Sequence, residues 1–418
     1  MEKSGKFRLT SLERNWILYD VGNSAFVLMV ATLIPIFFNA LAEAGGLSSV
    51  EYLAYWGYAS SAVTVITAVL SPILGTVADT KGFKKPIFIL CVFVGIVGCC
   101  AMGAVSAWLP FLVIFVIAKV GFSGSLVFYD SMLSDVTTPE RMDEVSSRGY
   151  AWGYIGSCVP FVVCLGLVLG AGSIGIGQMT ALNLALLLTA AWWLLTTLPL
   201  LKSYKQLYYV EVEKHAVRQS FARIGHTLRH LPEDKQVFWF LLAFFCYIDG
   251  VYTIIDMATA YGTALGLDTT GLLLALLVTQ IVAFPSALIF GRLSNKYPSA
   301  KLIPVCIAAY AGIAVFAFFL TQQWQFWVLA VIVGMFQGGV QALSRSHFAK
   351  IIPPEKSGEY FGLFDICGKG ASFLGTMIVS VGSQLTGSAN VGVGSLIVLF
   401  IVGFVLFRVS CKKEVVPE

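Results

Sequence analysis

Lysine and arginine alternate strictly among the connections that join the long apolar stretches of this chain. One set of connections holds essentially all of the basic residues, as in 81–85, whereas the other set, which includes 170–178 and 265–270, holds none. Positively charged loops remain on the cytoplasmic side of a membrane. The alternation therefore predicts a multi-pass membrane protein with an even number of spans and with both termini in the cytoplasm.

The composition leaves room for little besides membrane spans. Of 418 residues, 57% are hydrophobic and 12% are charged, whereas soluble domains have roughly 45–50% apolar and about 25% charged residues. The net charge of +4 is explained by loops that face anionic lipid, and no loop has the basic and aromatic pattern of a nucleic-acid-binding segment. A span needs about 20 apolar residues, so the fold class predicted is an all-α integral membrane protein with twelve transmembrane helices. We place the spans at 15–42, 52–78, 86–106, 109–134, 148–170, 179–201, 236–264, 271–292, 302–321, 325–348, 358–385 and 391–409.

Nothing in the chain indicates an enzyme. Eight of the nine cysteines lie in apolar spans and no pair has Cys-x-x-Cys spacing, so we expect neither disulfides nor zinc. The spacing of His226 and His230 would suit a metal, but no acid is placed to complete a site. The sequence also lacks a phosphate-binding glycine loop and a nucleophile elbow. We expect no cofactor and no metal.

Two loops recur at one offset, which indicates an internal duplication. Gly75 to Asp79 reappears as Gly291 to Asn295, 216 residues later, and Pro139 reappears as Pro354 at an offset of 215. Repeats of this kind predict two parallel six-helix bundles with a binding site between them at the membrane midplane. We divide the chain into bundles at 1–201 and 236–418 and a cytoplasmic connection at 202–235. The connection is predicted to carry an amphipathic surface helix, with a disordered charged linker as the alternative.

One of these loops resembles a known signature. Gly75, Asp79, Gly82, Lys84 and Lys85 are similar to the loop between the second and third helices of the major facilitator superfamily. An acid at a helix end can pair with bases or cap a neighbouring helix, so the resemblance implies a gating role for these residues. Because Asn295 replaces the acid in the second copy, we expect the gate of the first half to be stronger.

Three further stretches resemble the vacuole effluxer family, which includes the autophagy-related amino-acid exporters. They begin at Tyr19-Asp20, at Phe128-Tyr129-Asp130 and at Gln341, and they run on to Arg141 and past Arg345, which we add to the gating set. Family members more often have Trp-Ala where this chain has Val21-Gly22. The resemblance implies efflux of amino acids, and its bacterial branch implies the plasma membrane of a prokaryote.

Seven ionisable residues lie inside the predicted spans, where a charge is costly and is a functional candidate by default. Asp365 and Lys369 are four residues apart on one helix face and can pair directly, so a self-satisfied structural pair is the alternative. Lys119 and Asp130 lie roughly 16 Å apart along their helix and cannot pair with each other. The full set is Asp20, Lys119, Asp130, Asp249, Asp256, Asp365 and Lys369.

These charges suit a zwitterionic substrate. Lys119 or Lys369 would bind a carboxylate and Asp249 an amine, while protonation of Asp249 or Asp20 would couple transport to a proton gradient. Polar residues on the same helices are weaker candidates, with packing or interhelical hydrogen bonding as the alternative. They are Asn23, Tyr129, Tyr252, Gln337 and Gln341.

The sequence predicts a secondary transporter that works by alternating access. We expect proton-coupled efflux of a small polar or amino-acid-like metabolite by a monomer in membrane lipid. An exporter of amphipathic drug-like or lipid-like compounds is the alternative within transport. A non-transporting membrane sensor or assembly partner is the alternative of another class, although such proteins usually add a soluble output domain.

Overall fold

The computed structural model describes residues 7–211, 225–227 and 229–411. The first part of the chain forms α1 (Ser11–Ala31), α2 (Leu33–Ala44), α3 (Ser49–Ala78), α4 (Lys84–Met102), α5 (Trp108–Ser131), α6 (Leu133–Val136), α7 (Met142–Leu169) and α8 (Gln178–Ser203). The second part forms η1 (Leu231–Glu233), α10 (Lys235–Ala264), α11 (Thr269–Leu293), α12 (Ser299–Phe318), α13 (Gln323–Ile351), η2 (Pro354–Lys356), α14 (Ser357–Thr386), α15 (Ala389–Gly394) and α16 (Ile397–Ser410). We call these parts the first and the second half.

Each predicted span corresponds to helical structure. Eleven segments of the described chain are long and apolar enough to cross a membrane. The remaining place is taken by α14, a helix of 30 residues that packs against α3 and α10. Three crossings consist of two helical pieces each, namely α1 with α2, α5 with α6, and α15 with α16.

The break between α1 and α2 follows from one proline. Pro35 has no backbone N–H, and its ring clashes with the carbonyl of the residue four positions earlier, which is Ala31. The first helix ends at Ala31, and α2 begins two residues later. The Thr32 hydroxyl bonds the carbonyl oxygen of Leu28 at 2.5 Å and so satisfies one acceptor that the break exposes.

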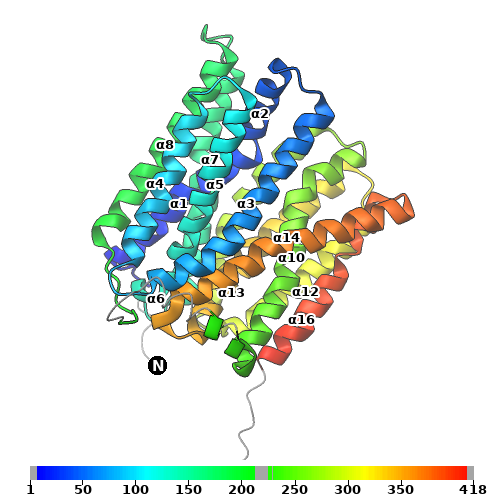
Figure 1. Ribbon diagram of the computed structural model, residues 1–418. Helices are drawn as coiled ribbons and strands as arrows, with labels where there is room; N and C mark the ends of the chain where they lie inside the picture. Colours follow the sequence, from blue (N-terminus) through cyan, green and yellow to red (C-terminus); the bar gives the residue numbers. More distant parts are fainter. Residues whose placement is uncertain (1–6, 212–224, 228, 412–418) are drawn as a thin grey trace, which may run out of the picture.

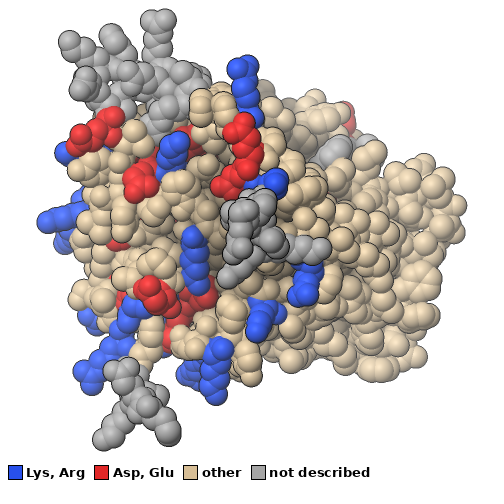
Figure 2. All heavy atoms as spheres, turned by 90° about the horizontal axis from the view of Figure 1, so that it is seen from below, with Lys and Arg blue, Asp and Glu red and all other residues tan. Residues whose placement is uncertain are grey.

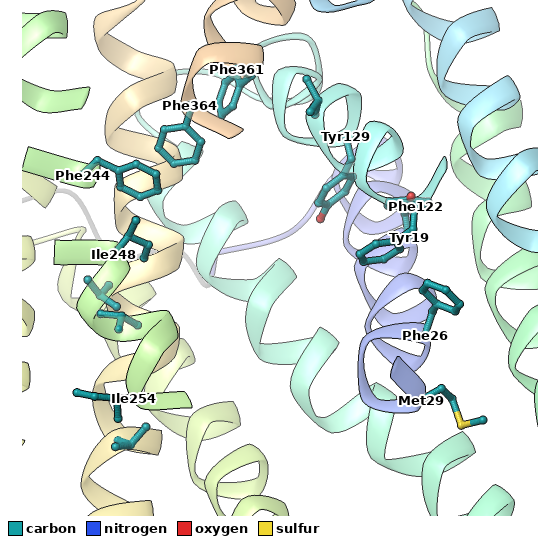
Figure 3. Packing of buried hydrophobic residues seen from close by; sticks show 14 of the residues in the cluster. Tyr19, Phe26, Met29, Phe122, Tyr129, Phe244, Ile248, Ile254, Phe361 and Phe364 are labelled. Atoms are coloured by element: carbon teal, nitrogen blue, oxygen red, sulfur yellow. The ribbon is translucent and has the colours of Figure 1, made fainter. Parts of the chain in front are cut away.

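Each half has its own aromatic core. In the first half Phe26 and Phe122 pack at 5.2 Å between ring centroids, beside Tyr19 and Tyr129, which are 4.8 Å apart. In the second half Phe244 stacks on Phe364 at 3.9 Å. Figure 3 shows the two groups on separate sets of helices, and Figure 1 shows the helices running between the two ends of the bundle.

The helices α4, α8, α12 and α16 carry apolar side chains on their outer faces. Phe93 is 61% exposed, Leu195 is 64% exposed and Val305 is 54% exposed. Large exposed apolar side chains suit lipid rather than water. These are the third, sixth, ninth and twelfth crossings, which the sequence leaves without internal charges.

Basic residues gather at one end of the bundle, which we call the basic end. The connections α3–α4, α6–α7 and α11–α12 lie there, and so does the start of α10, at the bottom of Figure 1. Figure 2 looks onto this end and shows Lys and Arg interspersed with Asp and Glu over part of it. The predicted surface helix of the connection falls mostly on residues 212–224 and 228, which lie outside the described part of the chain.

Candidate functional site

The two halves meet at the basic end. The end of α3, from Ser71 to Asp79, packs against the start of α14, and α7 packs against the ends of α11 and α13. Glycines bring the helices into backbone contact: a Cβ added at Gly75 would lie 2.1 Å from the Gly358 carbonyl oxygen. Because hydrogen bonds and ion pairs join the halves in this layer, the structure is closed at the basic end.

Asp79 of the signature loop caps a helix of the opposite half. Its carboxylate accepts hydrogen bonds from the backbone amides of Gly358 at 2.7 Å and Glu359 at 2.8 Å, at the positive end of the α14 dipole. The fully buried Lys84 lies 3.8 Å from Asp79 and donates to Ser357 at 2.8 Å. Burial raises the pKa of Asp79 to about 7, although Lys84 and the two amides oppose this shift.

The repeat-related contact at α7 has a different chemistry. Asn295, 216 residues after Asp79, donates its side-chain amide to Glu144 at 2.8 Å. Nearby, Asp143 accepts a hydrogen bond from the Ser346 hydroxyl at 2.6 Å and pairs with Lys350 at 2.6 Å. This junction therefore joins α7 to both α11 and α13 through side chains rather than through helix-terminal amides.

Arg345 lies in the middle of the closed layer and is 2% exposed. It lies inside the predicted span 325–348, and α13 continues past it to Ile351. Its guanidinium donates to Asp130 at 2.9 Å and lies 3.9 Å from Asp20. It also bonds the hydroxyl of Ser146 at 2.9 Å and its carbonyl at 3.0 Å. One side chain of the second half thus contacts α1, α5 and α7 of the first.

Three aromatic rings surround the same guanidinium. The distances from the Arg345 Cζ to the ring centroids are 4.3 Å for Tyr150, 4.7 Å for Trp16 and 5.4 Å for Tyr129. Trp16 stacks on Tyr129 at 4.3 Å and donates its indole N–H to the Tyr129 carbonyl at 2.9 Å. A cation held between ring faces and carboxylates is stabilised by both.

The structure therefore brings together Asp20, Tyr129, Asp130 and Arg345, although only their separate roles are predicted from the sequence. Asn23 joins this group through a 3.4 Å hydrogen bond to Asp20. One oxygen of Asp20 and the Tyr129 hydroxyl are buried, and apart from their interaction with each other they have no hydrogen-bond partner. Buried polar atoms in this condition are uncommon and mark strained or functional sites.

The remaining predicted acids have different surroundings. Asp365 accepts a hydrogen bond from Ser71 at 2.8 Å and so also bridges the halves. Asp249 is fully buried within the second half, where both of its oxygens accept the Gly375 amide at 2.8 and 2.9 Å. This bonding ties α10 to α14, which is a structural use of the carboxylate.

Lys119 and Asp256 lie on opposite halves farther from the basic end. Asp256 is exposed, Lys119 is half-buried with its ammonium 4.7 Å from the Phe122 ring centroid, and the charge of Lys119 acts on Asp256. The acid that faces Lys119 is thus Asp256 rather than Asp249. Tyr252, one turn below Asp256 on α10, is influenced by the charges of Asp130 and Arg345. The Lys369 side chain lies outside the described residues.

Other predicted residues stay within one half. Arg141 holds Glu13 at 2.7 Å and the Arg8 carbonyl at 2.8 Å, all in the first half. Lys85 contacts the Tyr204 carbonyl at 3.5 Å, and Gly82 adopts a φ of 80°, which favours glycine. In α13, Gln337 is buried and Gln341 is half-buried.

Several residues of the closed layer are not in the predicted set. They are Trp16, Asp143, Glu144, Ser146, Tyr150, Ser346 and Lys350. Lys84 is also more deeply placed than a loop base, because its side chain is completely buried. The repeat contains one pattern that could have linked two of the residues: the offset of 215 that relates Pro139 to Pro354 also places Asp130 and Arg345 at equivalent positions.

Comparison with known families decides the assignment. Residues 47–414 match the family model described as "Vacuole effluxer Atg22 like". The chain belongs to this family. It is 42% identical over 404 residues to an uncharacterized MFS-type transporter, YxiO, of Bacillus subtilis (strain 168), a match that covers 96% of this chain and 94% of the relative. Autophagy-related protein 22 of Saccharomyces cerevisiae (strain ATCC 204508 / S288c) is 26% identical over 283 residues, covering 58% of this chain and 53% of that protein.

Solved structures confirm the predicted fold. The fucose transporter FucP in its outward conformation aligns with a TM-score of 0.72 at 15% identity, covering 96% of this chain and 98% of that one. A bacterial homologue of the iron transporter ferroportin, in an outward-facing state, aligns at 0.69 and 15%, covering 96% and 99%. This protein is therefore a multi-pass membrane transporter with the twelve-helix major facilitator fold.

Proposed function

We propose that this transporter works by alternating access and exports a small polar or zwitterionic, amino-acid-like metabolite from the cytoplasm in exchange for protons. The observation that carries the proposal is the closed layer at the basic end. Its contacts are polar and local, so rocking of one half against the other can break them together. Their loss would open a path to the side that is now sealed.

The basic end is assigned to the cytoplasm, and both termini with it. Lys81, Arg292 and Lys301 are exposed and lie in or beside the connections α3–α4 and α11–α12 of this end, and this distribution favours the cytoplasmic leaflet of a prokaryotic plasma membrane. In that orientation the structure corresponds to an outward-facing state. We take the working form to be a monomer surrounded by lipid.

Lys119 and Asp256 support a zwitterionic substrate. They supply opposite charges on opposite halves, and both side chains are at least partly accessible. A substrate carboxylate would bind Lys119 and its amine Asp256, which would place the substrate between the halves where alternating access requires it. The family description as an effluxer agrees with export.

Proton coupling is assigned to the acids around Arg345. Asp20, Asp130 and Asp365 share this region with a single described guanidinium, and Tyr129, Tyr150 and Tyr252 are the other titratable groups that face it. Asp20 and Asp130 share the one guanidinium of Arg345, so these two carboxylates leave an excess of negative charge in a low dielectric, and binding a proton relieves that excess.

A ligand screen followed by transport tests the substrate assignment. Thermal stabilisation of purified protein by amino acids, small peptides, sugars and nucleosides would be measured for wild type, Lys119→Ala and Asp256→Asn, with the exposed Lys301→Ala as the matched control. We expect a zwitterion to stabilise wild type and the control but neither site variant. In proteoliposomes, export of that ligand should follow an inward proton gradient and be lost in Asp20→Asn.

An apolar cavity favours a second candidate, export of amphipathic compounds. It lies inside the second half between α10, α11 and α13 and is lined by Tyr261, Leu329, Val333 and Gln337, among others. A hydrophobic compound that stabilises wild type and both site variants equally would support this candidate and overturn the zwitterion assignment.

A further inference from the structure

The side chains that hold Arg345 form a complete site for a positively charged group, and all of them belong to the first half. Trp16 and Asp20 come from α1, Tyr129 and Asp130 from α5, and Tyr150 from α7. We call these five residues the cation box. Its occupant in this structure comes from α13 of the second half, so the box can lose that occupant without losing any of its own walls.

The space inside the box depends on a glycine of α7. A Cβ added at Gly149 would lie 3.1 Å from the Arg345 Nη2, 3.1 Å from the Asp20 Oδ2 and 3.1 Å from the Trp16 ring. These distances are tighter than most side chains tolerate, so a larger residue would occupy the volume of the guanidinium. The first half therefore leaves room for a planar cation between its rings and carboxylates.

Arg345 leaves one oxygen of the Asp20 carboxylate without a close charged partner. The Asp20 Oδ2 is 3.9 Å from the nearest guanidinium nitrogen, and the Asp20 carboxylate and the Tyr129 hydroxyl interact with each other but form no well-aligned hydrogen bond there. Asp20 is 7% exposed and Tyr129 is 1% exposed. Buried atoms of this kind are satisfied by a ligand or an ordered water in a functioning site.

We infer that the cation box binds an ammonium or guanidinium group of the transported molecule when the basic end is open, and that Arg345 occupies the box in its place when the basic end is closed. The inference rests on the proposed function, since separation of the halves withdraws Arg345. Withdrawal would leave Asp20 and Asp130 as uncompensated charges among aromatic rings. An organic cation satisfies both the carboxylates and the ring faces.

Binding of the cargo and closure of the basic end then exclude each other, because both require the cation box. While a cationic group fills the box, Arg345 cannot return and the basic end stays open. Release of the cargo frees the carboxylates, and Arg345 restores the contacts to Asp130 and Ser146. The box would thus select cargo that carries a cationic group. It would also keep the basic end open for as long as that group is bound.

Chemical rescue tests whether the box binds a free cation. The full chain with Arg345→Ala would be titrated with methylguanidinium chloride, with sodium chloride as the ionic-strength control, and thermal stabilisation recorded; Arg345→Gln serves if the alanine variant does not fold. We expect methylguanidinium to stabilise Arg345→Ala saturably, with half-maximal stabilisation at a concentration at least tenfold lower than in wild type. Adding Asp20→Asn and Asp130→Asn should abolish it. Absence of stabilisation, or equal stabilisation with the acids neutralised, would overturn the inference.

A locked chain tests whether the box is used in alternation. Glu144→Cys with Asn295→Cys, joined by a short cross-linker that carries two thiol-reactive maleimide groups, would hold the halves together at a contact outside the box. Wild type and the unjoined variant should bind methylguanidinium weakly, and the joined form not at all. If Arg345→Ala binds the cation but wild type and unjoined chains never do, the box is not a cargo site and the inference fails. Transport of a zwitterion that persists in that case leaves the proposed function intact.

Discussion

Two junctions close the basic end, and they occupy equivalent positions in the repeat while using different chemistry. At the first, Gly75 and Asp79 of α3 meet the start of α14; at the second, Gly291 and Asn295 of α11 meet the start of α7. Both junctions bring a helix end of one half against a helix start of the other. The geometry is therefore duplicated with the sequence.

The difference lies in where the charge resides. Asp79 is a buried carboxylate that accepts two backbone amides and lies beside the buried Lys84. Asn295 is a neutral donor to a Glu144 carboxylate that Arg148 already pairs within the same helix. The position equivalent to Lys84 is Ala300. At these equivalent positions one junction thus has a buried carboxylate beside a buried lysine and the other a neutral amide, so the two should respond differently to mutation and to pH.

Removing the carboxylate of the first junction should have the largest effect. Asp79→Ala leaves two helix-terminal amides without an acceptor and removes one of the two carboxylates beside the buried Lys84, which keeps its ion pair with Asp135 at 3.5 Å. Each unsatisfied buried amide costs about 1–3 kcal/mol, so we expect a loss of roughly 2–6 kcal/mol in the free energy of closure. We expect the population of basic-end-open molecules to rise sharply, as measured by fluorescence energy transfer between the halves. The exposed Lys81→Ala is the matched control, and an equal response in both variants would contradict the assignment.

Crowding the helix contacts should rank next. A methyl group at Gly75 would meet the Gly358 carbonyl at 2.1 Å, whereas one at Gly291 would meet the Ser147 side chain at 2.9 Å. Overpacking costs about 1–3 kcal/mol. The cost should be higher at Gly75, because the backbone of Gly358 can move away less easily than the side chain of Ser147. Gly75→Ala should therefore open the basic end more than Gly291→Ala in the same assay. The reverse order would show that the α7–α11 contact is the tighter one.

Asn295→Ala should weaken the second junction by a smaller amount. It removes one hydrogen bond to a charged group, for which about 1.5 kcal/mol is expected, and Arg148 still satisfies Glu144. Closure should fall by no more than about tenfold, and Asn295→Asp should weaken it further by placing two carboxylates together. A gain of closure in Asn295→Asp would refute this account of the junction.

The pH response should separate the junctions most cleanly although its size is modest. The pKa of Asp79 is raised to about 7 by burial in the closed state, and in the open state, where water reaches it, we expect its ordinary value. The closed state thus holds the proton more tightly, so closure is favoured at low pH and weakens as the pH rises through 7. Between pH 6 and 8 the change is about 1.4 kcal/mol.

Substitution assigns this pH response to one side chain. Asp79→Asn should abolish the part of the response that levels off above pH 7, whereas Asn295→Ala should retain it. Fluorescence energy transfer across the basic end as a function of pH provides the measurement. A pH response that survives in Asp79→Asn with the same midpoint would assign the titration to another group.

The sequence predicted the fold and one of the junctions because both have local signatures. Charge alternation located the helices, and the repeated loop identified Asp79 and its neutral counterpart. Asp20 and Asp130 were selected because an acid within an apolar span is rare. Asp249 met the same criterion but bonds the Gly375 amide within its own half, and no sequence pattern distinguishes these two surroundings of a buried acid.

Contacts between distant helices account for what the sequence did not reveal. Trp16 and Tyr150 read as ordinary aromatic residues of apolar segments, and their role depends on Arg345, about 330 and 195 residues away. Arg345 itself lies near a helix end, where bases are expected in loops. Only the packing of α13 against α7 turns its side chain into the first half.

The most direct test measures the distance between the halves at the basic end. Paramagnetic labels carried by unnatural amino acids at Glu140 and Glu355, which are repeat-related and exposed, would report that distance by double electron–electron resonance in lipid, in wild type and in Arg345→Ala. We predict a predominant short distance in wild type and a shift of most molecules to a longer distance in Arg345→Ala. An unchanged short distance in Arg345→Ala would contradict the claim that Arg345 holds the two halves together.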